Sequence, residues 1–367
     1  MQVRAALVRE AGRLEVVPVA LEPPRAGEVL VRIRAAGVCH SDLHTLRGEL
    51  RARPPLVLGH EGAGVVEAVG PGVTRVAPGD PVVINWLPGC RTCEPCLRGE
   101  PNLCRRLEQT TFQGRLPDGS TRIRLEDGTA VGHYLGSATM AEYTVVPEEG
   151  VVPLLEGVPF EVGAILGCAV VTGVGAVFHT ARMPPGQRAA VIGCGGVGLS
   201  ALLGCLATGA HTVIAVDTVA DKLALARRLG ATHTVHAGQE DVVALLRHLT
   251  DGGPDYVFDS VGAATTIRQA LEAVRPGGTA TLIGLHAALD EVAIRPGVLI
   301  FQNKTLRGSF AGSMRPEVDL PMLQRIYLAG HLDLDALITR RYPLEEIAQA
   351  FADMEAGRLA RGVLVME

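Results

Sequence analysis

Four cysteines lie close together in a stretch rich in Gly, Pro and Arg, at the spacing C-x2-C-x2-C-x7-C. They are Cys90, Cys93, Cys96 and Cys104. Cysteines three residues apart on a tight loop are poor disulfide partners. The iron–sulfur alternative fits poorly, because a ferredoxin run has a shorter last spacing and then a proline, whereas Arg105 follows Cys104. Four thiolates around Zn²⁺ suit this spacing, so it predicts a structural zinc site with no open position for chemistry.

A second set of metal-binding residue types is spread along the chain. Cys39 opens the run Cys-His-Ser-Asp-Leu-His, the pair His60-Glu61 follows a glycine, and Cys168 lies in an apolar run. Each is weak evidence when taken alone, because a lone buried cysteine is usually an inert core residue. The spacing by itself does not join these residues into one site.

A glycine-rich turn forms the third candidate site. The motif G-x-G-x-x-G follows the apolar strand Ala189–Ile192 and opens an apolar helix that ends near Thr208. This is the context of a dinucleotide-binding turn, in which the glycines allow the tight turn, the approach of a pyrophosphate and close helix packing. The phosphates then lie at the positive end of the helix. The motif residues that we expect to contact the cofactor are Gly193, Gly195, Gly196, Val197 and Gly198.

An acidic residue follows this turn at the distance that the motif requires. Asp217 ends the next strand, 19 residues after Gly198. Its carboxylate would accept hydrogen bonds from the adenosine ribose and repel a 2′-phosphate. Thr218 and Val219 come next, with no arginine, so the sequence favours NAD over NADP. The alternative is that Asp217 only caps the next helix.

The elements that position these residues fall into three parts. The first 160 residues contain short strands broken by Gly and Pro, whereas strands and helices alternate from about Gly186, which implies a parallel sheet. The chain then returns to helices and a last strand. After the strand and helix of the glycine turn, the expected strands are Thr212–Asp217, Tyr256–Asp259, Thr279–Leu285 and Gly362–Val365. The expected helices are Asp221–Leu229, Thr265–Val274, Pro321–Ala329 and Leu344–Ala356.

Composition limits the kind of protein. The 367 residues are 47% hydrophobic and 20% charged, with a formal net charge of −5, so no basic surface suggests nucleic acid. Charges in the first 17 residues argue against a secretory signal, and we expect a cytoplasmic protein. The uncharged stretches Val162–Ala181 and Ala189–Val216 are long enough to span a membrane. Glycines and a β-rich end in the second indicate a buried strand–turn–helix–strand unit, so we expect no membrane partner.

Taken together, five motifs resemble the zinc-dependent medium-chain alcohol dehydrogenases, over essentially the whole chain. They are GVCHSDLH (Gly37–His44), GHEGAGVVEAVGPGV (Gly59–Val73), the Cys90–Cys104 cluster, LGC (Leu166–Cys168) and GCGGVG (Gly193–Gly198). The resemblance implies an α/β protein with a GroES-like β-rich catalytic domain at residues 1–169, including a zinc lobe near 86–106. A Rossmann domain with a doubly wound parallel sheet is expected at 170–309, and a return to the catalytic domain at 310–367.

The resemblance also implies a catalytic zinc ion held by Cys39, His60 and Cys168, with an open position for the alcohol oxygen. Two zinc ions per subunit are therefore expected, one catalytic and one structural. Glu61 adjoins a ligand and would exchange onto the metal; an ordinary buried ion pair is the alternative. Asp42 is expected to accept a hydrogen bond that orients His60.

By the same resemblance, the proton of the alcohol leaves through Ser41 and then His44. A capping hydroxyl and a surface histidine are the alternatives for these two residues. The resemblance places four further residues near NAD: His40, Thr172, Lys222 and Arg361. It places five residues beside Ser41 around the substrate: Trp86, Tyr134, Leu135, Leu285 and Phe310.

These apolar walls favour NAD-linked, reversible oxidation of a medium-size or aromatic primary alcohol to its aldehyde. The segment Arg105–Thr139 resembles the long loop of glutathione-dependent formaldehyde dehydrogenases, and the run Val83–Trp86 resembles the mycothiol-dependent ones, so a thiol adduct is the alternative substrate. Two residues depart from the glutathione-dependent group: His44 replaces a tyrosine, and Glu108 replaces an anion-binding arginine. A homodimer is expected from the long loop. A zinc-binding protein without enzymatic activity is a further alternative, which the net charge and the complete dinucleotide motif disfavour.

Overall fold

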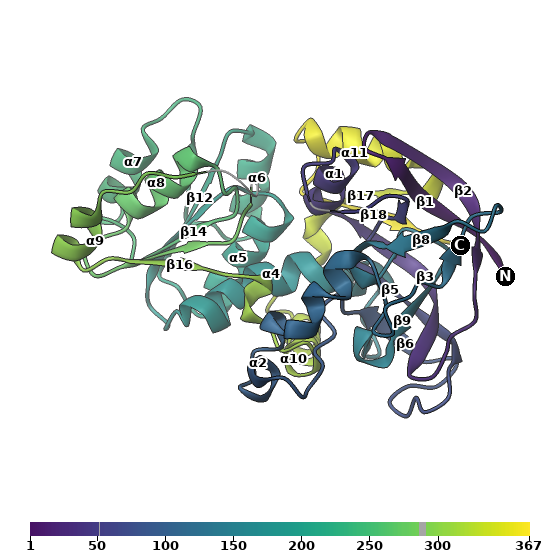
Figure 1. Cartoon of the computed structure of the whole chain (residues 1–367). Helices are drawn as coiled ribbons and strands as arrows, with labels where there is room; N and C mark the ends of the chain where they lie inside the picture. Colours follow the sequence, from purple (N-terminus) through teal and green to yellow (C-terminus); the bar gives the residue numbers. More distant parts are fainter. Residues whose placement is uncertain (51, 286–290) are drawn as a thin grey trace. The chain divides into compact units, whose positions relative to one another are not determined.

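The computed structural model describes residues 1–50, 52–285 and 291–367, which form two compact units. The path of the chain through the helices and strands of each unit can be followed in Figure 1. Unit 1 comprises Met1–Cys168, Arg315–Leu328 and Ile338–Glu367, and unit 2 comprises Ala169–Met314 and Ala329–Leu337. The chain therefore begins and ends in unit 1, and most of unit 2 is inserted as one continuous stretch. The predicted boundaries at 169/170 and 309/310 stay predictions.

A small closed barrel makes up one part of unit 1. Its strands follow the order β1-β2-β7-β8-β4, in which β1 and β2 form a long antiparallel hairpin and β4 closes the barrel by pairing with both β1 and β8. An apolar cluster fills this barrel and includes Leu7, Val19 and Ile123, all almost fully buried. The strands are β1 (Gln2–Glu10), β2 (Arg13–Leu21), β4 (Leu56–Val57), β7 (Ile123–Arg124) and β8 (Ala130–His133).

A larger sheet makes up the rest of the β structure of unit 1. Its order is β10-β6-β5-β3-β18-β17, and β9 also pairs with β3. Strand β3 is central in this sheet and contains several β-branched residues, which favour strand structure. It ends directly before Cys39. The strands are β3 (Glu28–Val38), β5 (Gly62–Val69), β6 (Pro81–Ile84), β9 (Tyr143–Pro147), β10 (Val151–Pro153), β17 (Ile338–Tyr342) and β18 (Arg361–Val365).

Short helices accompany these strands. The α-helices of unit 1 are α1 (His40–Leu46), α2 (Glu94–Leu97), α3 (Phe160–Ile165), α10 (Pro316–Leu328) and α11 (Ile347–Glu355). Single 3-10 turns lie at Pro101–Leu103, Arg105–Glu108, Thr111–Gln113, Tyr134–Gly136, Glu148–Gly150 and Leu344–Glu346. Helix α11 packs Phe351 and Met354 into the core that also holds Leu43 of α1. This shared core ties the end of the chain to the first metal-binding segment.

Unit 2 contains a parallel sheet in the order β13-β12-β11-β14-β15-β16. The strand order reverses its direction between β11 and β14, so right-handed crossovers place α5 and α6 on one face and α7 and α8 on the other. Its strands are β11 (Arg188–Ile192), β12 (Thr212–Asp217), β13 (His233–His236), β14 (Tyr256–Asp259), β15 (Thr279–Leu282) and β16 (Thr305–Gly308). Its α-helices are α4 (Val171–Gly175), α5 (Gly196–Ala207), α6 (Ala220–Arg228), α7 (Val242–Leu249), α8 (Ala264–Ala273) and α9 (Pro296–Gln302). Turns at Ala311–Ser313 and Asp335–Leu337 are 3-10.

Two π-helical turns interrupt the helical stretch Phe160–Ala181, at Leu166–Val170 and Ala176–Ala181. Among the described residues, this stretch is long and apolar enough to cross a membrane, with a mean hydropathy of 1.9. Of its most apolar window, 83% is buried inside the protein. A core helix passes the same test, and the burial supports that interpretation.

Several elements differ from those expected from the sequence. Helix α10 begins at Pro316, five residues before the expected start at Pro321, which lies inside the helix. Strands β13 and β16 and helices α7 and α9 were not predicted. The two strands are only four residues long, which leaves little alternation to detect. Helix α7, by contrast, is amphipathic and begins after the capping residue Asp241, so its sequence signal was available. The expected strand Thr279–Leu285 ends at Leu282. The other predicted strands and helices lie within one to three residues of those observed.

Candidate active site

Three separate segments of unit 1 bring together the ligand-type residues Cys39, His60, Glu61 and Cys168. One ligand atom from each lies within 4.8 Å of all the others, and all four residues are buried. Cys39 is the extended residue between β3 and α1, and the two residues before β5 are His60 and Glu61. Cys168 lies in the π-helical turn at Leu166–Val170, a kind of irregularity that often occurs at functional sites.

The pairing of β3 with β5 sets this arrangement. Ala36 faces Gly62 across the two strands, and the Gly37 amide donates to the Glu61 carbonyl at 3.2 Å. A Cβ atom at position 37 would lie 2.8 Å from Cδ of Glu61, so only glycine leaves room for that carboxylate. The sequence motifs around Cys39 and His60 are therefore two halves of one structural element.

Asp42 orients the imidazole of His60. Its carboxylate accepts from the Gly59 amide at 2.9 Å and lies 3.2 Å from Nδ1 of His60. Burial alone would lower the pKa of His60, but Asp42 and Cys39 outweigh it and raise the pKa to about 10. With Nδ1 directed at Asp42, Nε2 is the nitrogen left to bind a metal.

The surroundings of Cys39 favour its thiolate form. A hydrogen bond with Cys168 holds the pKa of Cys39 well below its usual value, against the opposing effect of burial. The positive charge of Arg361 acts in the same direction. Thiolate is the form that binds metal ions, so the donor set fits Zn²⁺.

Glu61 forms the buried ion pair that was the alternative for this residue, and it also lies among the ligand-type residues. One carboxylate oxygen pairs with Arg361, while the other, Oε2, is buried without a hydrogen-bond partner in the part of the chain that the structure describes. A carboxylate oxygen of Glu61 also belongs to the cluster with the thiols and the imidazole. Because a buried acceptor without a partner is costly, its position supports a metal ion at this site.

Arg361 itself was expected at the cofactor pyrophosphate. In the structure it is 4% exposed and contacts Glu61. It opens β18, and the pairing of Gly362 with Val38 places it beside the end of β3. Nothing in the sequence signals this pair, whose members lie 300 residues apart.

Residues expected around the proton route and substrate are placed as follows in unit 1. The Oγ atom of Ser41 lies 3.8 Å from Sγ of Cys39, and the backbone carbonyl of Ser41 accepts from the Tyr134 hydroxyl at 2.9 Å. The rings of Trp86 and Tyr134 meet His60 edge-on, with centroids 5.8 and 5.6 Å away. Leu135 is partly buried next to Tyr134 and has a positive φ of 47°. His40 and His44 lie on one face of α1, with ring centroids 6.3 Å apart.

The four clustered cysteines form the other candidate metal site. Their ligand atoms lie within 4.8 Å of one another, and the Sγ–Sγ distances are 4.0 Å for Cys90–Cys96 and 3.8 Å for Cys93–Cys104. All eight cysteines of the chain are free of disulfides. A closed set of four sulfur ligands is that of a structural zinc site.

The glycine turn of unit 2 has the geometry that the motif predicts. Gly193 has φ of +91°, and a Cβ on Gly198 would come within 2.6 Å of the Ser260 hydroxyl and overlap the Gly193 carbonyl. A Cβ on Gly195 would meet nothing within 4 Å, so the space beside it is open. Ser260 also holds this turn, although it was not predicted: its hydroxyl donates to the carbonyls of Ile192 and Gly193 at 3.0 Å. The position of Ser260 directly after the predicted strand Tyr256–Asp259 is the sequence signal that could have found it.

The Asp217 carboxylate accepts hydrogen bonds from the glycine turn and from the turn that follows β12. It accepts from the Cys194 amide at 2.7 Å and from the Val219 amide at 2.9 Å. Lys222 lies in the first turn of α6 and Thr172 in α4. The two predicted substrate residues of unit 2, Leu285 and Phe310, are 58% and 41% exposed.

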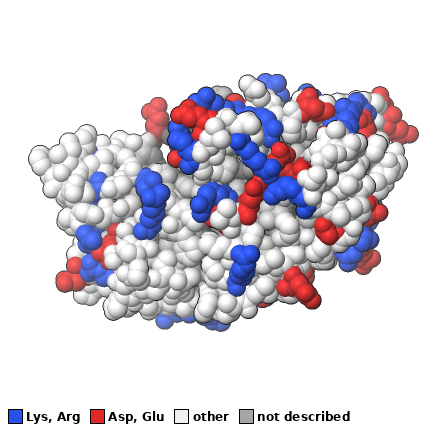
Figure 2. Space-filling model, turned by 90° about the horizontal axis from the view of Figure 1, so that it is seen from below, with Lys and Arg blue, Asp and Glu red and all other residues white. Residues whose placement is uncertain are grey.

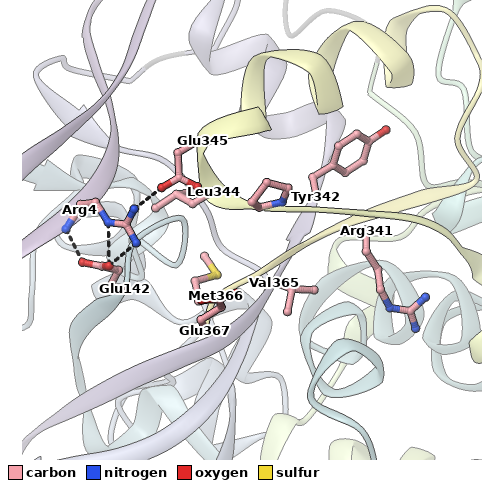
Figure 3. Close-up of a pocket in the computed structure, with 10 residues that line it drawn as sticks. Arg4, Glu142, Arg341, Tyr342, Leu344, Glu345, Val365, Met366 and Glu367 are labelled. Atoms are coloured by element: carbon pink, nitrogen blue, oxygen red, sulfur yellow. Dashed lines mark hydrogen bonds and ion pairs between the residues drawn. The ribbon is translucent and has the colours of Figure 1, made fainter.

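A separate pocket of about 550 Å³ lies in unit 1 near the C-terminus (Figure 3). Arg4 sits there between Glu142 and Glu345. None of the predicted site residues lines it. Charged side chains elsewhere also meet their opposites, as Arg98 does with Glu94 and Glu100, and Figure 2 shows blue and red side chains interspersed on the face drawn.

The chain matches known proteins over its whole length. The family described as "Alcohol dehydrogenase GroES-like domain" matches residues 25–156, and the family "Zinc-binding dehydrogenase" matches residues 196–326. The S-(hydroxymethyl)glutathione dehydrogenase of Paracoccus denitrificans is 41% identical, with 100% of both chains covered. The alcohol dehydrogenase zinc-binding domain protein of Burkholderia ambifaria has a TM-score of 0.96 at 36% identity, covering 100% of this chain and 99% of its own. The benzyl alcohol dehydrogenase of Acinetobacter calcoaceticus has a TM-score of 0.95 at 31% identity, with 100% of both covered.

The fold and the two cysteine-containing sites define a zinc-dependent dehydrogenase that acts on small molecules. The chain belongs to the zinc-dependent medium-chain alcohol dehydrogenase family. The expected fold class, a GroES-like β-rich domain with an inserted Rossmann domain, is confirmed. The expected cofactors, two zinc ions and a nicotinamide dinucleotide, are also confirmed.

Proposed function

We propose that this protein is an NAD-linked dehydrogenase that oxidises the hydroxymethyl group of a formaldehyde–thiol adduct to an S-formyl thioester. The observation that carries the proposal is full-length similarity, at 41% identity, to an S-(hydroxymethyl)glutathione dehydrogenase. The buried cluster of Cys39, His60, Glu61 and Cys168 supports it, because these residues offer the donors that such chemistry needs. An unmodified primary alcohol, the first expectation from the sequence, becomes the second candidate.

Cys39, His60 and Cys168 would hold the catalytic zinc ion, and Glu61 would take part in ligand exchange. Zinc bound there supplies Lewis acidity, which lowers the pKa of a substrate hydroxyl. The two thiolates offset the charge of the metal. Asp42 keeps the ring of His60 in one orientation, since a ligating histidine donates its other N–H to a carboxylate.

The remaining residues of unit 1 remove the proton and exclude water. We assign Ser41 as the first proton acceptor and His44 as the residue that passes the proton to solvent. Trp86 and Tyr134 pack edge-on against His60, whose side chain is only 1% exposed. NAD bound in unit 2 would accept the hydride from the carbon that bears this hydroxyl, so the substrate would lose one hydride and one proton.

NAD is favoured over NADP at the cofactor site of unit 2. The carboxylate of Asp217 lies at the end of β12, held by two backbone amides beside the glycine turn. A negative charge fixed there repels the 2′-phosphate of NADP and accepts the ribose hydroxyls of NAD. We place Lys222 near the same ribose, His40 and Arg361 near the pyrophosphate, and Thr172 near the nicotinamide.

An aromatic primary alcohol is the second candidate substrate. Similarity to a benzyl alcohol dehydrogenase over both full chains favours it. The exposed carboxylate of Glu108, in the turn after the cysteine cluster, also favours it, because it would repel the carboxylates of glutathione. We assign Leu135, Leu285 and Phe310 to the apolar walls in either case.

NADH absorbance decides between the two candidates. Zinc-loaded enzyme and NAD are mixed with formaldehyde alone, formaldehyde plus glutathione, formaldehyde plus mycothiol, or benzyl alcohol. We expect reduction of NAD with formaldehyde only when a thiol is present, and a higher kcat/KM for the glutathione adduct in Glu108→Arg. Thiol-independent oxidation of benzyl alcohol, with no reaction of either adduct, would replace the first candidate by the second.

A further inference from the structure

A carboxylate lies against the last residue of the proposed proton route. Glu49 follows α1 by three residues, and one of its oxygens pairs with Nδ1 of His44. The amide of Glu49 also donates to the carbonyl of His44 at 2.9 Å. Gly48 has φ of +74°, which lets the chain turn back. Backbone and side chain together therefore hold Glu49 beside the imidazole.

This contact determines which nitrogen of His44 can accept a proton. A carboxylate accepts hydrogen bonds, so it selects the form of the ring in which Nδ1 carries hydrogen. Nε2 is then the free base. Catalytic bases are commonly oriented in this way by a third group.

The position of the pair suits a route from a buried site to water. Ser41 and His44 are one helical turn apart and so lie on the same face of α1. The side chain of His44 is 22% exposed and that of Glu49 is 43% exposed. The pair thus spans the change from the interior to solvent.

Several other charged groups near this turn, among the described residues, pair with groups other than His44. On α1, Asp42 faces His60 and Gly59, and the ring of His40 lies 6.3 Å from that of His44. Arg47 pairs with Glu355 of α11. The β1–β2 hairpin, which contacts this turn through Gly12 and Gly48, carries Arg9 and Arg13, and both pair with Glu15. Glu49 is therefore the acidic group paired with His44.

We propose that Glu49 is a positioning residue for proton release: it fixes His44 as the Nδ1–H tautomer, so that Nε2 accepts the proton that leaves the substrate hydroxyl. This inference rests on the proposed oxidation of a hydroxymethyl group. Ser41 takes the proton of the substrate hydroxyl and gives up its own, so Nε2 gains one proton for each one that the substrate hydroxyl loses. The same proton then passes to bulk water, so the enzyme returns to its starting state.

Glu49→Gln tests the proposal with a matched control. The amide keeps the size of the side chain but removes its charge and its preference for an N–H donor. Glu355→Gln is the control, because Glu355 pairs with the neighbouring Arg47 and is 42% exposed, close to the 43% of Glu49. Both variants should fold, since both side chains reach solvent.

The readouts are the pH profile of kcat for the best substrate and the ¹⁵N shifts of the His44 ring in the zinc-loaded enzyme. We expect Glu49→Gln to lower the plateau of the kcat profile roughly three- to tenfold, a part of the effect of a general base. The ring shifts should change from the Nδ1–H form to a mixture. Glu355→Gln should match the wild type in both measurements.

Identical pH profiles and ring shifts for Glu49→Gln and the wild type would overturn the proposal. In a His44→Gln background, the Glu49 change should have no further effect on kcat, and an equal loss there would assign Glu49 a role apart from His44. If the wild type oxidises neither a thiol adduct nor an alcohol, it is the proposed function that fails. The ring shifts then still test the tautomer.

Discussion

Replacing Asp42 by asparagine should release the catalytic zinc ion selectively. Asp42 is fully buried, and its two contacts, with the Gly59 amide at 2.9 Å and His60 Nδ1 at 3.2 Å, are both with N–H donors. Asparagine has one carbonyl oxygen and no charge, so one donor loses its acceptor and the other loses a charge-assisted bond. A hydrogen bond to a charged group contributes about 1.5–3 kcal/mol, which corresponds to roughly 10–100-fold in metal affinity, as for other partners of ligating histidines.

The assay is zinc content per subunit after dialysis against increasing chelator. We expect Asp42→Asn to lose one zinc ion at roughly 10–100-fold lower chelator strength than the wild type, while the cysteine-cluster zinc ion is retained as an internal standard. Asp319→Asn is the control, since Asp319 of α10 is equally buried but pairs with Arg315, which directly precedes that helix. Equal retention of both ions in Asp42→Asn, or equal loss from both sites, would refute the proposed role of Asp42.

Three further outcomes are expected from other parts of the chain. Gly195→Ala should weaken NADH binding in a fluorescence titration without changing thermal stability, because the new Cβ meets open space in the protein. Gly198→Ala should lower NADH affinity and thermal stability, because its Cβ would overlap the Gly193 carbonyl. Unchanged NADH binding in the two variants would argue against the cofactor turn. Burial would raise the pKa of Asp255, but hydrogen bonds from two arginines outweigh it and lower the pKa to about 2. Its contribution of about 2 kcal/mol is thus present above pH ~4 and lost as pH falls towards ~2, and urea unfolding of Asp255→Asn should show a weaker decline over that range. Phe301 of α9 is 90% exposed, and we expect Phe301→Glu to convert a homodimer to a monomer in light scattering; a wild-type monomer would contradict this.

The sequence predicted best those features that local patterns determine. The strands Thr212–Asp217 and Tyr256–Asp259 match the observed strands because each apolar run ends at an aspartate. Helix α10 shows the limit of this reasoning. Pro321 looks like a helix start, but Pro316 precedes it and takes that place, since proline is tolerated in the first turn.

The residues of the candidate sites likewise divide into those that local spacing predicts and those that only the fold brings together. The four clustered cysteines are local in sequence, so spacing alone predicted their grouping. Cys168 joins Cys39 and His60 only through the fold, and only a family resemblance linked them beforehand. The pair of Arg361 with Glu61 depends on the register of β18 against β3, which no local pattern specifies. By contrast, Glu49 lies five residues after His44, and that short spacing was an available signal.

Replacing one buried sulfur tests most directly the central claim that Cys39, His60 and Cys168 hold the catalytic zinc ion. Cys168→Ser removes a proposed zinc ligand, and Cys205→Ser changes a fully buried cysteine of α5 as the control. The measurement is NAD reduction by the best substrate, together with zinc content and NADH binding. We expect Cys168→Ser to bind NADH and one zinc ion but to lose oxidation, with Cys205→Ser active and holding two ions. Substantial oxidation by Cys168→Ser with two zinc ions retained would contradict the account.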